Sequence, residues 1–152
     1  MRTLLLSLAA VTALTACSSK PSSTRLDGTE SRALLIDRNW LDRMPANETD
    51  KLFVYRFVPN MGGGVFQDRT LFKGTFELFS FTVTGDKINF VLHETKQHVS
   101  SPFTIEKVDG PAPFDLKLTI TEDPRGPHVY YGIKAETDRD GAKLEHRLAA
   151  QH

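Results

Sequence analysis

Few residues of this sequence could do chemistry, and two of its five histidines come first because of their spacing. His93 and His98 enclose Glu94-Thr95-Lys96-Gln97 in a segment that ends a predicted strand. Zinc proteases instead carry two histidines four positions apart on a helix, with a glutamate after the first. A hairpin could still bring His93 and His98 together, with His128 as a third ligand. Exposed hairpin residues are the better interpretation, so we predict no metal and no other cofactor.

Other sequence features that could support catalysis are equally weak. Gly62-Gly63-Gly64 is glycine-rich, but a phosphate-binding loop also needs a Gly-Lys-Ser/Thr sequence and a helix start. We interpret these glycines as a hairpin tip. A serine nucleophile needs a positioned base, and no Gly-x-Ser-x-Gly sequence occurs. A carboxylate pair such as Glu77 with Asp115 is left open, although most carboxylates are expected on solvated strand faces, and we predict that the protein is not an enzyme.

Cys17 is the only cysteine of the chain, and it follows an export-like segment. Arg2 supplies a positive start, and residues 3–14 are mainly apolar. This run is too short to cross a bilayer core of ~30 Å, which needs about 20 apolar residues. A charged start, a brief apolar run and small residues before a cleavage point are typical of a signal peptide. We therefore predict that residues 1–16 are a signal peptide.

The end of this segment, Leu14-Thr15-Ala16-Cys17, resembles the lipobox of bacterial lipoproteins. The resemblance implies that the Cys17 thiol receives a diacylglyceryl group, that the signal is cut before it, and that the new amine is acylated by a fatty acid such as palmitate. Two or three acyl chains meet the two-signal requirement for stable anchoring. The alternative is an ordinary secretory signal that ends near a cysteine by chance. A lone thiol without a disulfide partner in an oxidising compartment favours lipidation.

Residues 17–30 are predicted to be the lipidated cysteine and a flexible tether, because Ser18-Ser19-Lys20-Pro21-Ser22-Ser23-Thr24 contains little that could pack. Lipoproteins with Asp directly after the cysteine tend to stay in the inner membrane. Ser18 holds that position here, and by this resemblance we expect a lipid anchor in the outer membrane. The membrane is thus the first predicted partner, through the acyl chains on Cys17.

Charge is balanced, with 19 basic and 19 acidic residues. Because no basic excess exists, we predict no binding to nucleic acid. The length left after the tether suits one domain, and we assign residues 31–152 to it.

Apolar and polar residues alternate with the period of a β-strand through most of this domain. The clearest segments are 52–58, 75–83, 86–93 and 114–121, and weaker ones are 34–41, 64–72, 98–107 and 129–134. Thr84-Gly85-Asp86-Lys87 predicts a tight hairpin. Only residues 142–150 have a helical composition.

About eight short strands with hairpin-length links predict an all-β fold, an antiparallel up-and-down barrel with a short C-terminal helix, with a flattened sandwich as the alternative. The order of the elements resembles a lipocalin-type barrel, with an early tryptophan (Trp40), consecutive hairpins and a helix after the last strand. The lipocalin signature has a glycine two positions before its tryptophan, where this chain has Arg38. The resemblance therefore implies a lipocalin-like shape.

Aromatic residues are the most suggestive feature of the predicted strands. Ten phenylalanines occur, all after residue 50. Eight aromatic residues are expected to line the barrel interior, and all of them except Phe103 are candidate ligand contacts: Phe53, Tyr55, Phe57, Phe79, Phe81, Phe90, Phe103 and Phe114. Arg56 lies at a polar position of the expected strand 52–58, and Glu77 at a polar position of the expected strand 75–83. A salt bridge at the barrel mouth would explain why these positions are charged.

An eight-stranded barrel is just wide enough to be filled by side chains or to hold one small ligand. Our first hypothesis is a lipid-anchored envelope protein that binds a small apolar or amphipathic molecule inside the barrel. The second is an envelope interaction or assembly protein, or a hydrolase inhibitor, without a ligand cavity. A metal-dependent or carboxylate enzyme is the third. The protein partner is not identified by the sequence, and interior volume discriminates between the first two hypotheses.

Overall fold

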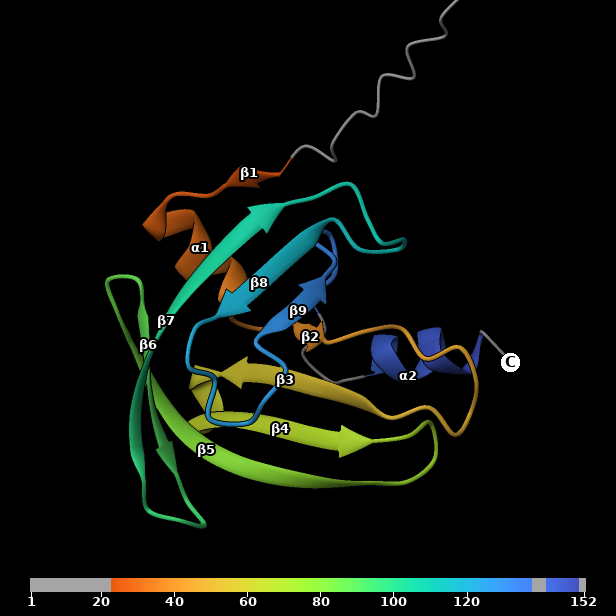
Figure 1. Cartoon of the computed structure of the whole chain (residues 1–152), viewed down its shortest axis with the longest axis horizontal. Coiled ribbons are helices and arrows are strands. Elements are labelled where there is room, and N and C mark those ends of the chain that lie inside the picture. Colours follow the sequence, from red (N-terminus) through yellow and green to blue (C-terminus); the bar gives the residue numbers. More distant parts are fainter. Residues whose placement is uncertain (1–22, 138–141, 151–152) are drawn as a thin grey trace, which may run out of the picture.

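The computed structural model describes residues 23–137 and 142–150 (Figure 1). The predicted signal peptide, Cys17 and the first part of the predicted tether lie outside these residues. Among the described residues there is no helix with the length and apolarity needed to cross a membrane.

The fold is a closed antiparallel barrel of eight strands, as predicted. Each strand pairs with the next along the chain, and the last pairs with the first of the ring, so the connectivity is up-and-down. A ninth strand, β1 (Thr24–Arg25), pairs with the C-terminal end of strand β7, at Glu106 and Lys107. The strands of the ring are β2 (Asn39–Leu41), β3 (Leu52–Val58), β4 (Gly63–Arg69), β5 (Gly74–Thr84), β6 (Lys87–Leu92), β7 (His98–Lys107), β8 (Leu116–Ile120) and β9 (Val129–Gly132).

Hairpin chemistry matches these boundaries. Thr84 pairs with Lys87 across the predicted two-residue turn, and Gly85 has a φ of 62°, a left-handed conformation that glycine adopts without steric cost. A short 3-10 helix, η1 (Pro59–Met61), joins β3 to β4. The turn over 84–87 is therefore placed correctly, whereas Gly63 and Gly64 of the expected hairpin tip belong to β4.

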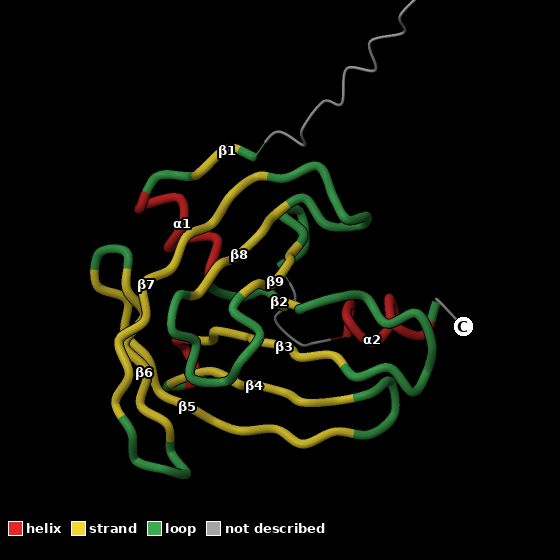
Figure 2. The backbone as a smooth tube through the Cα atoms, viewed as in Figure 1, coloured by secondary structure: helices red, strands yellow, loops and turns green. Residues whose placement is uncertain are grey.

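Two apolar clusters lie on opposite sides of the barrel wall, because successive side chains of a strand point to opposite faces. The interior cluster contains Trp40, Tyr55 and Phe57. The outer cluster contains Leu52 and Val54 of the same strand β3, covered by Leu144 and Leu148 of α2 (Ala142–Ala149). The predicted C-terminal helix thus packs against the outer wall (Figure 2).

The helix α1 (Gly28–Leu35) was not predicted. The sequence instead predicts a tether as far as residue 30 and a strand over 34–41. Asp27 begins the helix, because its side chain accepts hydrogen bonds from the Thr29 and Glu30 main-chain N–H groups, both at 2.8 Å. Only residues 39–41 of the expected strand are extended, as β2.

The helix α1 lies across one end of the barrel and contributes Leu34 and Leu35 to the interior cluster. The indole of Trp40 donates to the Leu35 carbonyl at 3.0 Å, so the start of β2 is tied to the end of the helix.

Arg38, at the position that departs from the lipocalin signature, ties β2 to the segment after β9. Its guanidinium lies 6.0 Å from the Trp40 ring centroid and donates to the Ile133 carbonyl at 2.7 Å. Burial lowers the pKa of Arg38, and the Asp115 carboxylate opposes that shift. At this position Arg38 fills buried space and makes main-chain hydrogen bonds.

Candidate functional site

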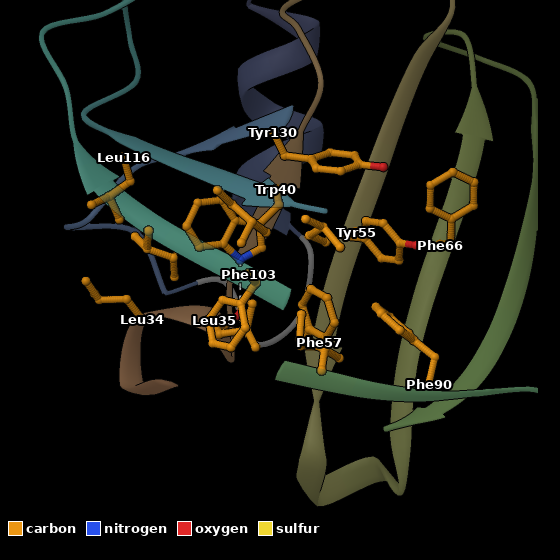
Figure 3. Close-up of a cluster of buried hydrophobic side chains, with 14 of the residues drawn as sticks. Leu34, Leu35, Trp40, Tyr55, Phe57, Phe66, Phe90, Phe103, Leu116 and Tyr130 are labelled. Carbon is orange, nitrogen blue, oxygen red and sulfur yellow. Dashed lines mark hydrogen bonds between the residues drawn. The ribbon is translucent and has the colours of Figure 1, made fainter. Parts of the chain in front are cut away.

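Aromatic rings gather in the barrel interior, where their side chains point toward one another (Figure 3). Tyr55 lies at their centre, with ring centroids 5.3 Å from Phe57, 4.8 Å from Phe66 and 5.6 Å from Phe79. Phe90 closes the group, 5.4 Å from Phe79. Most of the contacts are tilted or edge-to-face, arrangements that aromatic pairs favour.

Six of the seven predicted ligand contacts belong to this interior cluster: Phe53, Tyr55, Phe57, Phe79, Phe81 and Phe90. Tyr55, Phe57, Phe79 and Phe90 are almost completely buried, whereas Phe53 and Phe81 are partly exposed. Phe103 lies in the same cluster. Phe66 of β4 was missed, because the pattern over 64–72 is weak.

Phe114 is the exception, because it lies outside the barrel wall. It precedes β8 and belongs to the outer cluster, where its ring stacks on Tyr131 with a centroid distance of 5.6 Å. The alternation of 114–121 suggested that Phe114 shares a face with Leu116. The strand begins only at Leu116, so the alternation does not apply to the residue two positions earlier.

The opposite end of the barrel from α1 carries a polar cluster built around Asp123, in the loop between β8 and β9. Asp123 accepts hydrogen bonds from the Tyr55 hydroxyl at 2.8 Å and from the Tyr130 hydroxyl at 2.5 Å. It also accepts from the Arg125 main-chain N–H at 2.8 Å. Figure 3 shows the two tyrosine hydroxyls on the same side of the cluster.

Burial raises the pKa of both tyrosines well above its ordinary value, and the Asp123 carboxylate raises it further through its charge and hydrogen bond. Tyr55 and Tyr130 are therefore neutral hydrogen-bond donors. They hold the β8–β9 loop in place rather than serving as acids or bases near neutral pH.

Glu77 forms an ion pair in this region, but with Arg125 rather than with Arg56. The Arg125 guanidinium also lies 5.8 Å from the Phe66 ring centroid. The suggested pairing of Arg56 with Glu77 is wrong, because Arg56 shares the outer face of β3 with Val54 while Glu77 shares the inner face of β5 with Phe79. Arg125 could not be identified in advance, since only barrel closure brings its loop near β5.

The three histidines weighed as metal ligands lie apart from one another's contacts. Among residues 23–137 and 142–150 there is no group of three or more metal-ligating side chains. The Nδ1 of His128 lies 3.4 Å from the Asp123 main-chain nitrogen, within the loop at the barrel end. His93 and His98 flank the β6–β7 turn and are exposed, as expected.

His93 does contact a hydroxyl, since its Nε2 lies 2.9 Å from the Ser80 Oγ. A hollow of about 360 Å³ lies beside Ser80, against the second half of β5, the middle of β6 and the start of β7, and its lining includes Phe81, Phe90 and Val99 of the interior cluster. Its polar lining includes Asn89 and Ser100, which hydrogen-bond to each other at 2.8 Å. A nucleophilic serine also needs a third group that orients its base. His93 is exposed, and its contact with Ser80 is a hydrogen bond at the surface.

The outer face of β4 and β5 carries large apolar side chains that reach solvent. Phe72, in the turn between the two strands, is 73% exposed, and Phe76 of β5 is 68% exposed. Leu78 follows on the same face at 50%. A hollow of about 130 Å³ lies beside Phe72 and Phe76. We call Phe72, Phe76 and Leu78 the outer-wall patch.

Comparison of the chain with protein-family models, with curated proteins and with solved structures finds no match. The geometry of the barrel and of its outer wall therefore carries the functional argument.

Proposed function

We propose that this protein is a lipid-anchored interaction protein of the outer membrane, whose packed barrel presents the outer-wall patch to a protein partner. Cys17 supplies the anchor in this proposal, and the barrel is a rigid support. The observation that carries it is the filled interior beside an exposed apolar outer wall.

The filled interior supports interaction over storage of a small molecule. Tyr55 contacts five other rings at centroid distances of 4.8–6.0 Å: Phe57, Phe66, Phe79, Phe90 and Tyr130. Ligand pockets measure roughly 300–1,000 Å³. A ligand of that size placed around Tyr55 would have to separate these rings, and each aromatic pair contributes about 0.5–1.5 kcal/mol beyond the burial of its surface.

The outer-wall patch supports binding of a partner. A single exposed apolar side chain needs no explanation, but neighbouring exposed apolar residues mark interaction sites. Phe76 and Leu78 lie two positions apart on one face of β5, and Phe72 lies beside Phe76 at the same hollow. Aromatic residues are also enriched at the centres of protein interfaces.

Binding of a small apolar ligand remains the second candidate function. It is favoured by Phe81 and Val99, which belong to the interior cluster but are only partly buried. Saturable binding of a hydrophobic dye to the purified chain, lost on Phe81→Ser but kept on Phe76→Ser, would support this candidate instead.

The proposal is tested by affinity capture from solubilised envelope with the wild-type chain and with Phe76→Ser/Leu78→Ser. The matched control is Met61→Ser, because Met61 is 80% exposed and lies in η1, outside the patch. We expect a stoichiometric protein with the wild type and the control, reduced at least tenfold with the double variant. Equal recovery by all three chains, or no stoichiometric protein with the wild type, would refute the proposal.

A further inference from the structure

The first half of β5 is an open strand edge. Residues Gly74–Phe79 pair with β4, whereas pairing with β6 begins only at Phe79. Residues 74–78 therefore have a neighbouring strand on one side alone within the described part of the chain. In Figure 1 this half of β5 lies along the lower margin of the molecule.

Hydrogen-bond alternation shows which main-chain groups face that edge. The Thr70 N–H donates to the Lys73 carbonyl at 2.7 Å, which makes Thr70 and Lys73 a hydrogen-bonded pair. Hydrogen-bonded and non-bonded pairs alternate along an antiparallel ladder. Thr75 and Glu77 therefore bond to β4, and the N–H and C=O groups of Gly74, Phe76 and Leu78 point toward the open edge. The same alternation directs Thr84 toward Lys87 of β6, as the hairpin requires.

Of the usual devices that prevent strand pairing, this edge has only one inward-pointing charge, Glu77. Soluble proteins protect their edge strands with proline, lysine, bulges or inward-pointing charges. The sequence over 74–78 contains neither proline nor lysine, and its register with β4 is continuous, without a bulge. Its one charged residue, Glu77, is neutralised by Arg125. The edge is suited to accept another extended strand.

We propose that a second copy of this chain pairs with the open edge, β5 against β5 in antiparallel orientation, about a twofold axis at Phe76. Phe76 then faces the partner's Phe76, and Gly74 faces the partner's Leu78. Both pairs exchange main-chain hydrogen bonds, because all of these residues direct their N–H and C=O groups to the edge. A strand edge that is complementary to itself in this way is the requirement for a twofold interface.

The side chains fit this arrangement as well as the main chain. The hollow of about 130 Å³ lies directly across the edge from the partner's Leu78, and its lining combines the apolar Phe72 and Phe76 with Gly74, Thr75 and the polar side chains of Gln67, Arg69 and Lys73. Glycine is required at 74, because a Cβ there would meet the Arg69 side chain. The partner's Leu78 therefore reaches the hollow without competition from a side chain at 74, and the twofold axis repeats the contact.

The net charge of the chain and the position of β1 are compatible with the proposed dimer. The chain carries 19 basic and 19 acidic residues, so two copies do not repel each other through net charge. Figure 1 shows β1, where the described chain begins, on the side of the barrel opposite the open half of β5. Two tethers can thus leave the dimer without crossing its interface.

This inference rests on the proposed function, since it makes the outer-wall patch the binding surface and a second copy its first partner. Pairing places the two patches on one continuous sheet face. The dimer and the interaction function can be refuted independently, because dimerisation is measured on the purified chain and partner capture on solubilised envelope.

The first experiment is disulfide trapping in the full chain carrying Cys17→Ser, which has no native thiol. Opposed residues of a hydrogen-bonded pair have Cα atoms about 5.5 Å apart, within the range of a disulfide. We expect Phe76→Cys to form a covalent dimer on mild oxidation at least tenfold faster than Met61→Cys, which is exposed but distant from the edge. Equal rates at the two positions would overturn the proposal.

The second experiment is analytical ultracentrifugation of the Cys17→Ser chain with and without Phe76→Lys, with circular dichroism as the folding control. Lysine is a natural edge protector, and we expect it to weaken the dimer at least tenfold while Met61→Lys leaves it unchanged. A parent chain that is monomeric at about 100 μM would overturn the dimer. If envelope capture still depends on Phe76 and Leu78 in that case, the interaction function stands and its partner is a different protein.

Discussion

Replacing Asp123 with alanine removes the acceptor that holds two buried phenolic hydroxyls. Tyr55 and Tyr130 are fully buried, and each donates one hydrogen bond to a different oxygen of this carboxylate. A buried donor without a partner costs about 1–3 kcal/mol, so losing both partners costs about 2–6 kcal/mol. The same change frees the Arg125 main-chain N–H, which loosens the loop at the barrel end.

The assay is urea unfolding followed by the fluorescence of Trp40, the single tryptophan, which is buried in the interior cluster. With a denaturant slope of about 2 kcal/mol per molar urea, the midpoint should fall by roughly 1–3 M. The matched control is Glu94→Ala, which removes an exposed carboxylate from the β6–β7 turn. A surface change of this kind should alter the free energy of unfolding by less than about 0.5 kcal/mol.

A triple variant separates the hydrogen bonds from the packing. Adding Tyr55→Phe and Tyr130→Phe to Asp123→Ala removes the stranded hydroxyls together with their acceptor. Deleting both partners of a buried hydrogen bond costs much less than deleting one. We expect the triple variant to recover most of the stability lost in Asp123→Ala. The reasoning is refuted if Asp123→Ala unfolds at the same urea concentration as Glu94→Ala, or if the triple variant is less stable than the single one.

Three further predictions concern the folded barrel. Because burial raises the pKa of Tyr55 and Tyr130, the native state keeps two phenolic protons that the unfolded chain releases above pH ~10. The free energy of unfolding should therefore fall as pH rises above that point. In urea titrations at pH 9–11, Tyr55→Phe/Tyr130→Phe should show a flatter fall. Leu148→Ala leaves a cavity under α2 and should cost about 2–5 kcal/mol in the same assay, and a cost below 1 kcal/mol would mean that α2 does not pack as described. Gly64→Ala places a Cβ against the Phe79 ring and 2.7 Å from the Arg56 carbonyl oxygen and should destabilise by about 1–3 kcal/mol, whereas an unchanged midpoint would contradict the close packing at Gly64.

The barrel could be predicted because alternation and turn residues are local signals. Residues 114–121 alternate, and Leu116, Leu118 and Ile120 of β8 do face the interior. Thr84-Gly85-Asp86-Lys87 places the β5–β6 turn correctly. The eight expected segments correspond to the eight strands of the ring, including the weak segment 129–134, which forms β9.

The helix α1 was missed because its signal is short and mixed. Asp27 is a good N-cap, but it follows a serine-rich segment and precedes only eight helical residues. Residues 34–41 contain the end of the helix and the whole of the short strand β2. Neither the helical nor the strand periodicity therefore describes the entire segment. The buried face of α1 becomes visible only once the barrel end that it covers is known.

The site residues were partly predictable for a different reason. Alternation identifies which side chains share a face, and it placed Tyr55, Phe57 and Phe79 together correctly. It does not give distances across the barrel, so the Glu77–Arg125 pair and the two tyrosine bonds to Asp123 could not be predicted. The open edge was also hidden, because it arises from the difference between an 11-residue β5 and a 6-residue β6.

The central claim is that partners bind the outer wall while the interior stays filled. Site-specific photo-crosslinking in intact cells tests it most directly, with a photoreactive phenylalanine analogue at Phe76, at interior Phe81, or at exposed Lys87 of β6. The account predicts protein adducts at position 76 and at least tenfold fewer at positions 81 and 87. Small-molecule adducts at position 81 with none at position 76 would contradict it.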